Sequence, residues 1–287
     1  MSSPPAIVTR FAPSPTGRLH LGHAYSALFA EHAALESGGR FLLRIEDIDR
    51  ARCRPQFETG IFEDLAWLGL EWETPVRRQS DHLADYRAAL ERLDRDGLLY
   101  PCFCSRKEIQ AEIARAVAAP QGPEGALYPG TCRLLSAGER EQRLSEGRPY
   151  ALRLDVAAAL ARTGPLTWQD LGRGVILAAP EMLGDVVLGR RDAPASYHLA
   201  VSLDDDLQGV SLVTRGEDLF AATHIHRLLQ ALLGLATPAY RHHRLLTNDR
   251  GDRLAKRDGA LTLEALRQAG RTPAQVRAMA GFAPADL

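Results

Sequence analysis

The segment Arg10–His23 combines residue types that can bind a phosphate group; it reads Arg-Phe-Ala-Pro-Ser-Pro-Thr-Gly-Arg-Leu-His-Leu-Gly-His. It follows the apolar run 6–8 and precedes the helix-like stretch 24–30, which predicts a strand, a turn rich in Pro and Gly, and a helix. The start of a helix attracts anions through its backbone N–H groups and its dipole. Gly22 lets a ligand approach the backbone, and His20 and His23 can donate hydrogen bonds to phosphate oxygens. The alternative is a capped surface helix with two solvated histidines.

A basic, glycine-containing loop lies near the other end of the chain, at residues 248–259, and reads Asn-Asp-Arg-Gly-Asp-Arg-Leu-Ala-Lys-Arg-Asp-Gly. Lysine and arginine total 35, but only Lys107 and Lys256 are lysines. In a chain that otherwise uses arginine, a retained lysine is a candidate for chemistry that needs a compact ammonium. For Lys107, on a predicted exposed helix, chance is the simpler explanation. For the loop itself, a solvated turn is the alternative.

Three cysteines and a tyrosine have a spacing that suits a metal ion: Cys102-x-Cys104, followed by Tyr128-x-x-x-Cys132. Three soft ligands beside turns can bind zinc, but a structural zinc site uses four ligands, and tyrosine is an unusual fourth. Three buried or free thiols are the alternative. Cys53 stands apart, and we assign it no role.

The elements that must position these residues alternate between strands and helices. We expect strands at about 6–11 and 41–45, and helices at about 21–37, from residue 55, and at 83–96. This alternation favours a parallel sheet covered by helices. From Tyr100 to about residue 190 the pattern changes to a helix at about 105–118, a loop rich in Pro and Gly, and short strands at 150–154 and 186–188.

Alternation is expected to resume with Tyr197–Ser202, followed by a polar turn at Asp204–Asp206, a strand at 210–214 and a helix at 222–233. One or two short helices are expected at about 261–269 and 273–280. We therefore predict a nucleotide-binding α/β domain in two halves, 1–99 and 193–238. An inserted domain occupies 100–192, and a C-terminal segment with the basic loop occupies 239–287.

Composition excludes several classes of protein. The chain has 287 residues, is 45% hydrophobic and carries a formal net charge of −1, so any contact with nucleic acid must come from a local basic face. No stretch is long and apolar enough to span a bilayer, and no secretory signal is visible at the N-terminus. Four cysteines in a chain of this length do not suggest a disulfide framework, so we expect a cytoplasmic protein.

Together, these segments resemble the class I aminoacyl-tRNA synthetases, and specifically their glutamyl/glutaminyl branch. Phe11–Gly17 with His20-Leu21-Gly22-His23 resembles the HIGH motif, and Arg253–Arg257 resembles the KMSKS motif, with Arg253 and Ala255 as departures. The resemblance covers about residues 7–280. It implies a Rossmann-type parallel sheet with an inserted zinc-containing α+β domain and a short C-terminal helical segment.

The resemblance also implies the site residues. ATP, accompanied by Mg²⁺, would contact His20, Gly22, His23, Leu254 and Lys256, and the catalytic groups would be His20, His23 and Lys256. L-Glutamate would contact Arg10, Ala12, Ser14, Glu46, Tyr197 and Arg215. The family's Cys-x-Cys…Tyr-x-x-x-Cys pattern implies one structural zinc ion per chain, on Cys102, Cys104, Tyr128 and Cys132.

For Glu46 and Arg215 the alternative is an ordinary ion pair. Their chemistry nevertheless suits glutamate, because an arginine matches a carboxylate and an anion matches the α-ammonium group.

Few residues follow the KMSKS-like loop, so no anticodon-reading domain is expected there. This resembles shortened glutamyl-tRNA synthetase paralogues, which activate glutamate without tRNA and esterify it onto the queuosine base of tRNA(Asp). The partners implied are ATP, L-glutamate and queuosine-containing tRNA(Asp), and we expect a monomer. Basic residues that could follow the tRNA path are Arg241, His242, His243, Arg244, Arg250 and Arg257. A solvated face is the alternative for this set.

Three other functions remain open on the sequence alone. The first is a short glutamyl-tRNA synthetase that charges tRNA(Glu). The second is a catalytically inactive relative that binds tRNA or an amino acid, although the intact His20, His23 and Lys256 argue against it. The third is a non-tRNA nucleotidyltransferase, against which the segment Arg44–Arg50 argues.

Overall fold

The structure is a computed structural model of the 287-residue chain, and it describes residues 6–115, 121–123, 125–246 and 262–282. The first third of the chain builds a parallel sheet with its covering helices. The elements are β1 (Val8–Phe11), α1 (Leu21–Leu35), β2 (Arg40–Ile45), α2 (Pro55–Trp67), β3 (Arg77–Arg78), the 3-10 turn Gln79–Asp81 and α3 (Leu83–Arg95). Strand β1 pairs in parallel with β2, and β2 pairs in parallel with β3, as the alternating pattern predicted.

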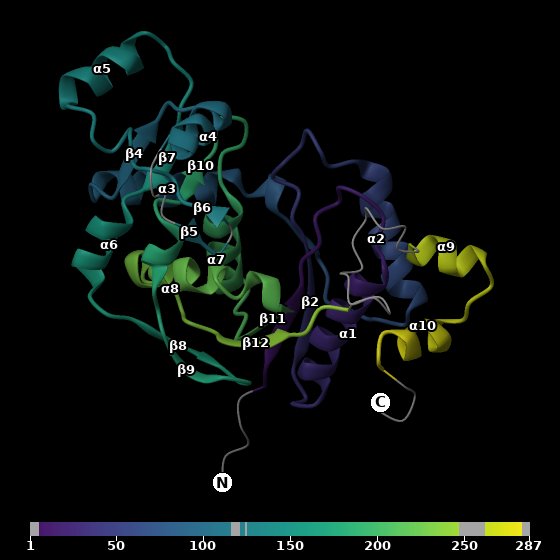
Figure 1. Cartoon of the computed structure of the whole chain (residues 1–287). Coiled ribbons are helices and arrows are strands. Elements are labelled where there is room, and N and C mark those ends of the chain that lie inside the picture. Colours follow the sequence, from purple (N-terminus) through teal and green to yellow (C-terminus); the bar gives the residue numbers. More distant parts are fainter. Residues whose placement is uncertain (1–5, 116–120, 124, 247–261, 283–287) are drawn as a thin grey trace.

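A second sheet continues this layer. Its strands are β11 (Leu212–Gly216), β12 (Ala239–His243) and the hairpin of β8 (Thr167–Asp170) and β9 (Gly174–Leu177). The Ser211 backbone N–H donates to the Val8 carbonyl at 3.0 Å, so β1 and β11 lie side by side. Helices α7 (Tyr197–Leu207) and α8 (Ala222–Leu233) pack on each other and on α3 and α6 (Val156–Thr163). The strands of the split α/β domain therefore form one layer, built from segments that are far apart in the sequence (Figure 1).

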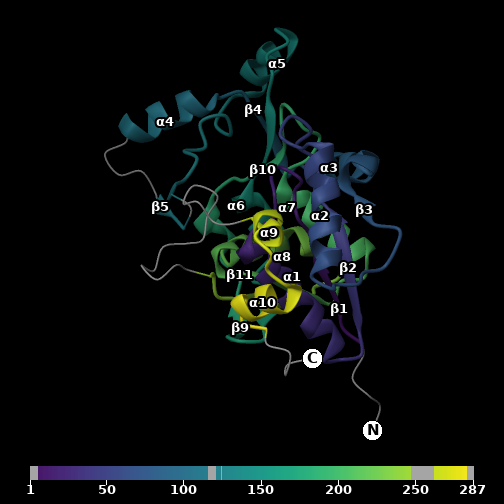
Figure 2. The same ribbon diagram turned by 90° about the vertical axis from the view of Figure 1, so that its right-hand side faces the viewer.

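The segment between these halves has its own antiparallel sheet. It contains β4 (Leu99–Cys102), α4 (Arg106–Arg115), β5 (Gln121–Gly122), β6 (Gly125–Ala126), α5 (Ala137–Ser145), β7 (Ala151–Leu154), the 3-10 turn Pro180–Leu183 and β10 (Val187–Gly189). The strand order is β10-β7-β4. Figure 2 shows α4 and α5 at the end of the molecule away from both termini. The hairpin β8-β9 lies inside the range 100–192 expected for the insertion, yet it pairs with β12 of the second sheet.

The stretch from Tyr197 differs from the expectation. It forms helix α7, and the expected polar turn at Asp204–Asp206 is wrong, because these residues belong to that helix. Leu199, Ala200 and Leu203 recur at helical spacing and face the core, and the helix continues to Leu207 before Gly209, whose φ is +66°. As a consequence, the carboxylates of Asp204 and Asp205 point inward and are buried.

The C-terminal helices α9 (Leu263–Gln268) and α10 (Pro273–Met279) pack against α2 and α1, as Figure 1 shows. Leu263, Leu266 and Val276 are buried in the core that lies beneath α1 and α2. The Leu263 N–H donates to the Leu19 carbonyl at 2.9 Å, which brings the end of the chain beside the start of α1. Among the described residues, no helix has the length and apolar character needed to cross a membrane.

Candidate active site

A cavity of about 640 Å³ opens where β1 and β11 end and α1 begins. This is the edge of a parallel sheet at which ligands bind in open α/β folds, and the volume is typical of small-molecule sites. The cavity brings residues of the segment Arg10–His23 together with residues that come much later in the sequence. Its walls include Arg10, Ala12, His20, Gly22, His23, Glu46, Tyr197 and Arg215.

The start of α1 uses both histidines as caps. His20 is the N-cap residue, and its Nδ1 accepts the Gly22 N–H at 3.1 Å. The Nδ1 of His23 accepts the His20 N–H at 3.2 Å, which completes a reciprocal capping box. A neutral imidazole that accepts at Nδ1 carries its proton at Nε2. Because both rings accept a backbone N–H at Nδ1, both can donate from Nε2.

The start of α1 can bind phosphate through side-chain donors, and not through the backbone donors that the sequence argument assumed. The N–H groups of His20, Gly22 and His23 are hydrogen-bonded within the turn, so they do not supply the donors that the sequence argument assigned to a helix start. The two imidazoles, whose ring centroids lie 3.8 Å apart, provide side-chain donors instead. A Cβ on Gly22 would come within 3.1 Å of the His20 ring, so glycine keeps this cap intact.

Arg10 is buried on β1 and holds the carboxylate of Asp205. Its Nε donates to Asp205 at 3.0 Å, its Nη2 donates to the other carboxylate oxygen at 3.4 Å, and its Nη1 donates to the Thr214 carbonyl at 3.2 Å. A guanidinium has five N–H donors, so two of those of Arg10 are not engaged by described residues. Burial alone would raise the pKa of Asp205, but Arg10 and Arg44 hold it below its ordinary value.

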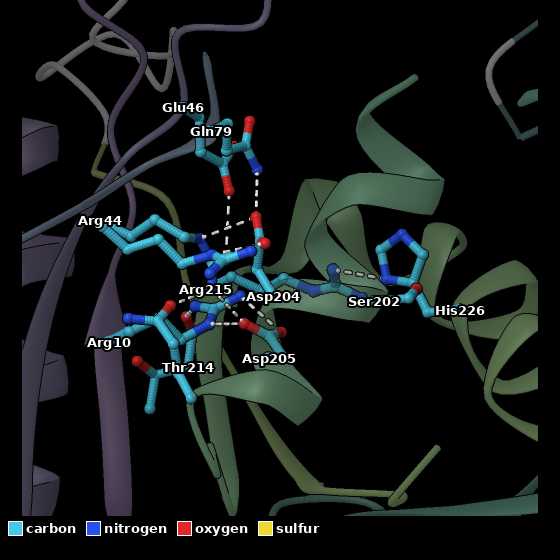
Figure 3. Close-up of polar contacts among 12 residues, drawn as sticks. Arg10, Arg44, Glu46, Gln79, Ser202, Asp204, Asp205, Thr214, Arg215 and His226 are labelled. Atoms are coloured by element: carbon cyan, nitrogen blue, oxygen red, sulfur yellow. Dashed lines mark hydrogen bonds and ion pairs between the residues drawn. The ribbon is translucent and has the colours of Figure 1, made fainter. Parts of the chain in front are cut away.

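Arg44 lies at the centre of the same network (Figure 3). Its side chain is fully buried, and Nη1 donates to Asp205 at 2.8 Å while Nη2 donates to Glu46 at 3.2 Å. Burial raises the pKa of Glu46, and the positive charges of Arg44 and Arg10 oppose that rise. Glu46 therefore presents a desolvated carboxylate at the cavity wall, where a bound ammonium would stabilise its charged form.

Arg215, on β11, also lines the cavity. Its Nε donates to His242 at 3.3 Å, and its Nη1 contacts Tyr197 Oη at 3.3 Å and His226 Nδ1 at 3.1 Å. Nη2 donates to the hydroxyl of Thr223. Four of its five N–H donors are thus engaged by described residues, which fixes the plane of the guanidinium.

Buried histidines complete the support of Arg215. His242 Nδ1 lies 2.6 Å from Asp170, so Asp170 accepts its N–H and His242 Nε2 is left to accept from Arg215. Burial lowers the pKa of His242 to about 4, against the opposing hydrogen bond with Asp170. Burial and the charge of Arg215 also lower the pKa of His226 and bring that of His198 to about 4. These rings are neutral near pH 7 and add no positive charge to the site.

The cysteine cluster lies outside this cavity, in the inserted segment. The sulfur atoms of Cys102, Cys104 and Cys132 lie within 4.8 Å of one another, and those of Cys104 and Cys132 are 3.4 Å apart. The Tyr128 hydroxyl lies 3.5 Å from Cys102 Sγ and 3.8 Å from Cys104 Sγ. Thiolates at about 2.3 Å from a tetrahedral zinc ion lie about 3.8 Å apart, so the cluster of three cysteines is compatible with zinc.

Comparison with known proteins identifies the family. The model of the tRNA synthetases class I (E and Q), catalytic domain, matches residues 6–281. The chain belongs to this family. A protein named glutamyl-Q tRNA(Asp) synthetase from Rhodobacter capsulatus is 52% identical over 96% of this chain and 100% of its own length. A protein of the same name from Nocardia farcinica is 47% identical over 94% of this chain and 82% of its own length.

Longer relatives match as well. Glutamate–tRNA ligase 2 of Nitrosococcus oceani is 41% identical over 93% of this chain, which spans 57% of that protein. A glutamate tRNA ligase from Elizabethkingia meningosepticum, solved in complex with its amino acid, superimposes with a TM-score of 0.71 at 30% identity. It covers 88% of this chain, and this chain spans 52% of it. The class I synthetase fold with its parallel sheet is thus confirmed.

In this class I synthetase, most of the predicted site residues line the cavity, but not all of them. Ala12 lines the cavity, and Tyr197 lines it as well and contacts Arg215. Ser14 is exposed and does not line the cavity. Leu254 and Lys256 lie in residues 247–261, outside the described residues. The described residues on either side border the same site, because Leu246 lines the cavity and Thr262 pairs with His20.

Two of the basic residues predicted to contact tRNA, both on β12, have other partners in this synthetase. His242 serves as the support of Arg215, and His243 is buried between the rings of Tyr25 and Phe29. Arg241 and Arg244 are exposed. Arg250 and Arg257 lie outside the described residues.

Sequence reasoning missed Arg44 and Asp205, which organise the site. An arginine inside the apolar run Phe41–Ile45 was a usable signal, because a buried charge needs a partner. Asp205 was missed because the sequence analysis assigned it to a polar turn, whereas it lies in helix α7.

Proposed function

We propose that the protein activates L-glutamate with ATP and transfers the glutamyl group to the queuosine base of tRNA(Asp). The observation that carries the first half is the pairing, in one cavity, of a donor pair at the start of α1 with two arginines and a buried carboxylate. The spare N–H groups of Arg10 and Arg215 match the side-chain carboxylate of glutamate, and Glu46 matches its α-ammonium group.

In the first step, an oxygen of the substrate α-carboxylate attacks the α-phosphorus of ATP. The bond to the bridging oxygen of the β-phosphate breaks, giving glutamyl-adenylate and pyrophosphate. His20 and His23 donate from Nε2 to phosphate oxygens, and Lys256 is proposed to stabilise charge on the leaving pyrophosphate. Mg²⁺ bound with ATP would neutralise part of the phosphate charge. The protein contributes position and charge, and needs no nucleophile of its own.

In the second step, a hydroxyl of the acceptor attacks the adenylate carbonyl carbon. The bond between the carbonyl carbon and the phosphate oxygen breaks, the hydroxyl proton leaves with the AMP phosphate, and an ester remains. The assignment of this acceptor as queuosine in tRNA(Asp) is supported by the names of the relatives that match over nearly the whole chain.

The test supplies the purified protein with labelled glutamate, ATP and one tRNA at a time. Queuosine-containing tRNA(Asp) should become labelled, whereas unmodified tRNA(Asp) and tRNA(Glu) should not. Glutamate-dependent exchange of pyrophosphate into ATP, measured without tRNA, tests the first step by itself. A protein that performs neither reaction would be an inactive relative.

A second candidate is a glutamyl-tRNA synthetase that charges tRNA(Glu). The 41% identity to a protein named glutamate–tRNA ligase 2 favours it. Label appearing on the 3′ adenosine of tRNA(Glu), and not on tRNA(Asp), would establish this alternative and reject the first.

A further inference from the structure

Arg18 lies in the turn that leads into α1, and it does not line the active-site cavity. Its Nε lies 3.0 Å from a carboxylate oxygen of Glu264, in the first turn of α9. Its Nη1 donates to the Gln56 carbonyl of α2 at 3.4 Å. One guanidinium thus joins this turn to two helices, one of which belongs to the C-terminal segment of the chain.

The backbone makes the same connection. The Leu19 carbonyl accepts the Leu263 N–H at 2.9 Å, and His20 forms an isolated antiparallel bridge with Thr262. His20 is the N-cap residue of α1 and Thr262 is the N-cap residue of α9, so the starts of the two helices lie side by side. The position of the His20 ring therefore depends on how α9 packs against the turn.

Gly60 of α2 leaves room for the Arg18 side chain. It lies in the middle of a 13-residue helix, where glycine is less favourable than alanine. A Cβ at this position would overlap Arg18 Nη1, which is the end of a flexible side chain, so alanine requires the guanidinium to move. A residue that weakens its own helix is thus explained by the space that it gives to Arg18.

Charge also favours an arginine in this turn. In the described part of the chain, the ion pairs of this junction join Glu63, Asp64 and Glu264 to Arg18 or Arg267. Asp64 is 1% exposed, and its carboxylate oxygens have no hydrogen-bond partner among the described residues. Burial raises the pKa of Asp64 to about 6, against the positive charges of Arg267 and Arg18. Loss of Arg18 would leave one guanidinium beside three carboxylates.

We propose that Arg18 is a positioning residue for ATP: it holds the turn at 17–20 between α2 and α9, and thereby keeps the His20 ring at the phosphate-binding side of the cavity. This inference rests on the proposed function, because that function supplies ATP as the ligand of His20. Arg18 itself touches no substrate and acts through His20.

The proposal separates the two substrates of the activation step. Arg10 is held by Asp205 of α7, and Arg215 is held by residues of α8 and β12, so the glutamate side of the cavity has its own support. Displacement of the turn at 17–20 should therefore weaken ATP binding and leave glutamate binding unchanged.

The experiment uses three variants that disturb Arg18 from different sides, Arg18→Gln, Glu264→Gln and Gly60→Ala. Arg78→Gln is the matched control. Arg78 pairs at 2.7 Å with Glu58 of the same helix α2, and its side chain is 39% exposed against 31% for Arg18. Each protein is characterised by the Kd of ATP with Mg²⁺, by the KM of ATP and of glutamate in pyrophosphate exchange, and by the melting temperature.

Arg18→Gln and Glu264→Gln should each raise the Kd and the KM of ATP roughly 3- to 10-fold, because a small displacement of a phosphate-binding group weakens its contacts. The double variant should lose no more than either single variant, since the two residues act as one pair. Arg78→Gln should leave both constants for ATP unchanged.

Gly60→Ala separates positioning from stability. The KM of ATP should rise by a similar factor, because the guanidinium is displaced. The melting temperature should stay at the wild-type value or rise, because alanine favours the helix. A glycine with a purely structural role would instead lower the melting temperature when it is replaced.

Two results would overturn the inference. Wild-type constants for ATP in Arg18→Gln would show that the turn keeps its position without the ion pair. Equal rises in the KM of ATP and of glutamate would show a general disturbance of the cavity. Failure of the proposed function is distinguishable from both, because the wild-type protein would then perform no glutamate-dependent exchange, while the Kd of ATP would still test the role of Arg18.

Discussion

At the scale of the residue, the two ring nitrogens of His20 have different tasks. Nδ1 accepts the Gly22 N–H and caps α1, whereas Nε2 carries the proton that can be donated to a phosphate oxygen. An asparagine Oδ1 occupies nearly the same place as Nδ1, and asparagine is a good N-cap residue. The capping and phosphate-binding roles can therefore be separated by substitution.

We predict that His20→Asn keeps the free energy of unfolding within about 0.5 kcal/mol of wild type, because the cap is retained. The pyrophosphate exchange rate should fall roughly 100- to 1,000-fold, since one donor to the transition state is lost. His20→Ala should lose the same activity and, in addition, about 1 kcal/mol of stability. Normal exchange in His20→Asn would show that Nε2 has no part in activation.

The sequence predicted which residues line the cavity better than it predicted the contacts that support them. Arg10, His20, His23 and Glu46 line the cavity, and their position could be predicted from the sequence, because strand ends that precede a turn and a helix meet at one edge of a sheet. The support of Arg215 could not be assigned, because Asp170, His226 and His242 come from three distant elements. Only the folded chain brings them together.

At the scale of the element, Arg44 joins β2 to α7. Its partners Asp205 and Glu46 are themselves buried, so removing the guanidinium leaves carboxylates without their main counter-charge. Arg40, on the same strand, pairs with Glu73, and both side chains are about half exposed (54% and 45%). The two arginines therefore form a matched pair that differs in burial.

We predict that Arg44→Met lowers the free energy of unfolding by roughly 3–5 kcal/mol, the usual cost of breaking a buried ion pair. Arg40→Met should lower it by about 1 kcal/mol or less, because exposed pairs contribute little. Denaturant unfolding of both variants provides the measurement. Similar losses in the two variants would contradict the role assigned to Arg44.

The loops around the cysteine cluster depend on a small core. Burial raises the pKa of Cys104 to about 12, whereas hydrogen bonds with Tyr128 and the Phe103 N–H hold the pKa of Cys132 below its usual value despite burial. Zinc, if bound, would fix these loops and the position of Tyr128.

We predict about one zinc ion per chain by elemental analysis of the purified protein. Chelation should increase protease cleavage within the inserted segment, between about residues 100 and 160, because the cluster would no longer hold its loops. Cys132→Ala should reproduce that cleavage without chelator, and Cys53→Ala, which alters a cysteine outside the cluster, should not. A metal-free protein with unchanged protease resistance would refute the zinc site.

At the scale of the whole molecule, the alternating pattern predicted the parallel sheet split by an insertion, but it did not predict how the insertion meets the sheet. The hairpin β8-β9 lies within the range 100–192, yet it pairs with β12 and supplies Asp170 to the support of Arg215. Such long-range pairing depends on register between strands that are about 70 residues apart, as Asp170 and Tyr240 are. No local periodicity encodes it.

With a net charge of −1, a tRNA would have to be attracted by a local surface, and the described residues offer two candidates. One is formed by the exposed Arg241, on β12, and Arg244, directly after it, which belong to the basic set predicted from the sequence. The other is a groove of about 480 Å³ whose walls include Arg148, Arg190 and Arg191. Arg241 lies over the ring of Phe29.

We predict that the double variant Arg148→Gln/Arg191→Gln binds tRNA(Asp) more weakly and reduces the slope of log Kd against log salt by roughly one to two, since each lost phosphate contact releases about one counterion fewer. Arg241→Gln/Arg244→Gln, which removes the same number of charges, should leave the slope near its wild-type value. Binding is measured at several KCl concentrations. Pyrophosphate exchange is measured for both variants, because Arg244 lines the active-site cavity whereas Arg148 and Arg191 line the separate groove. If the reduced slope appeared instead in the Arg241 and Arg244 variant, tRNA would approach along β12 and the groove would have another use.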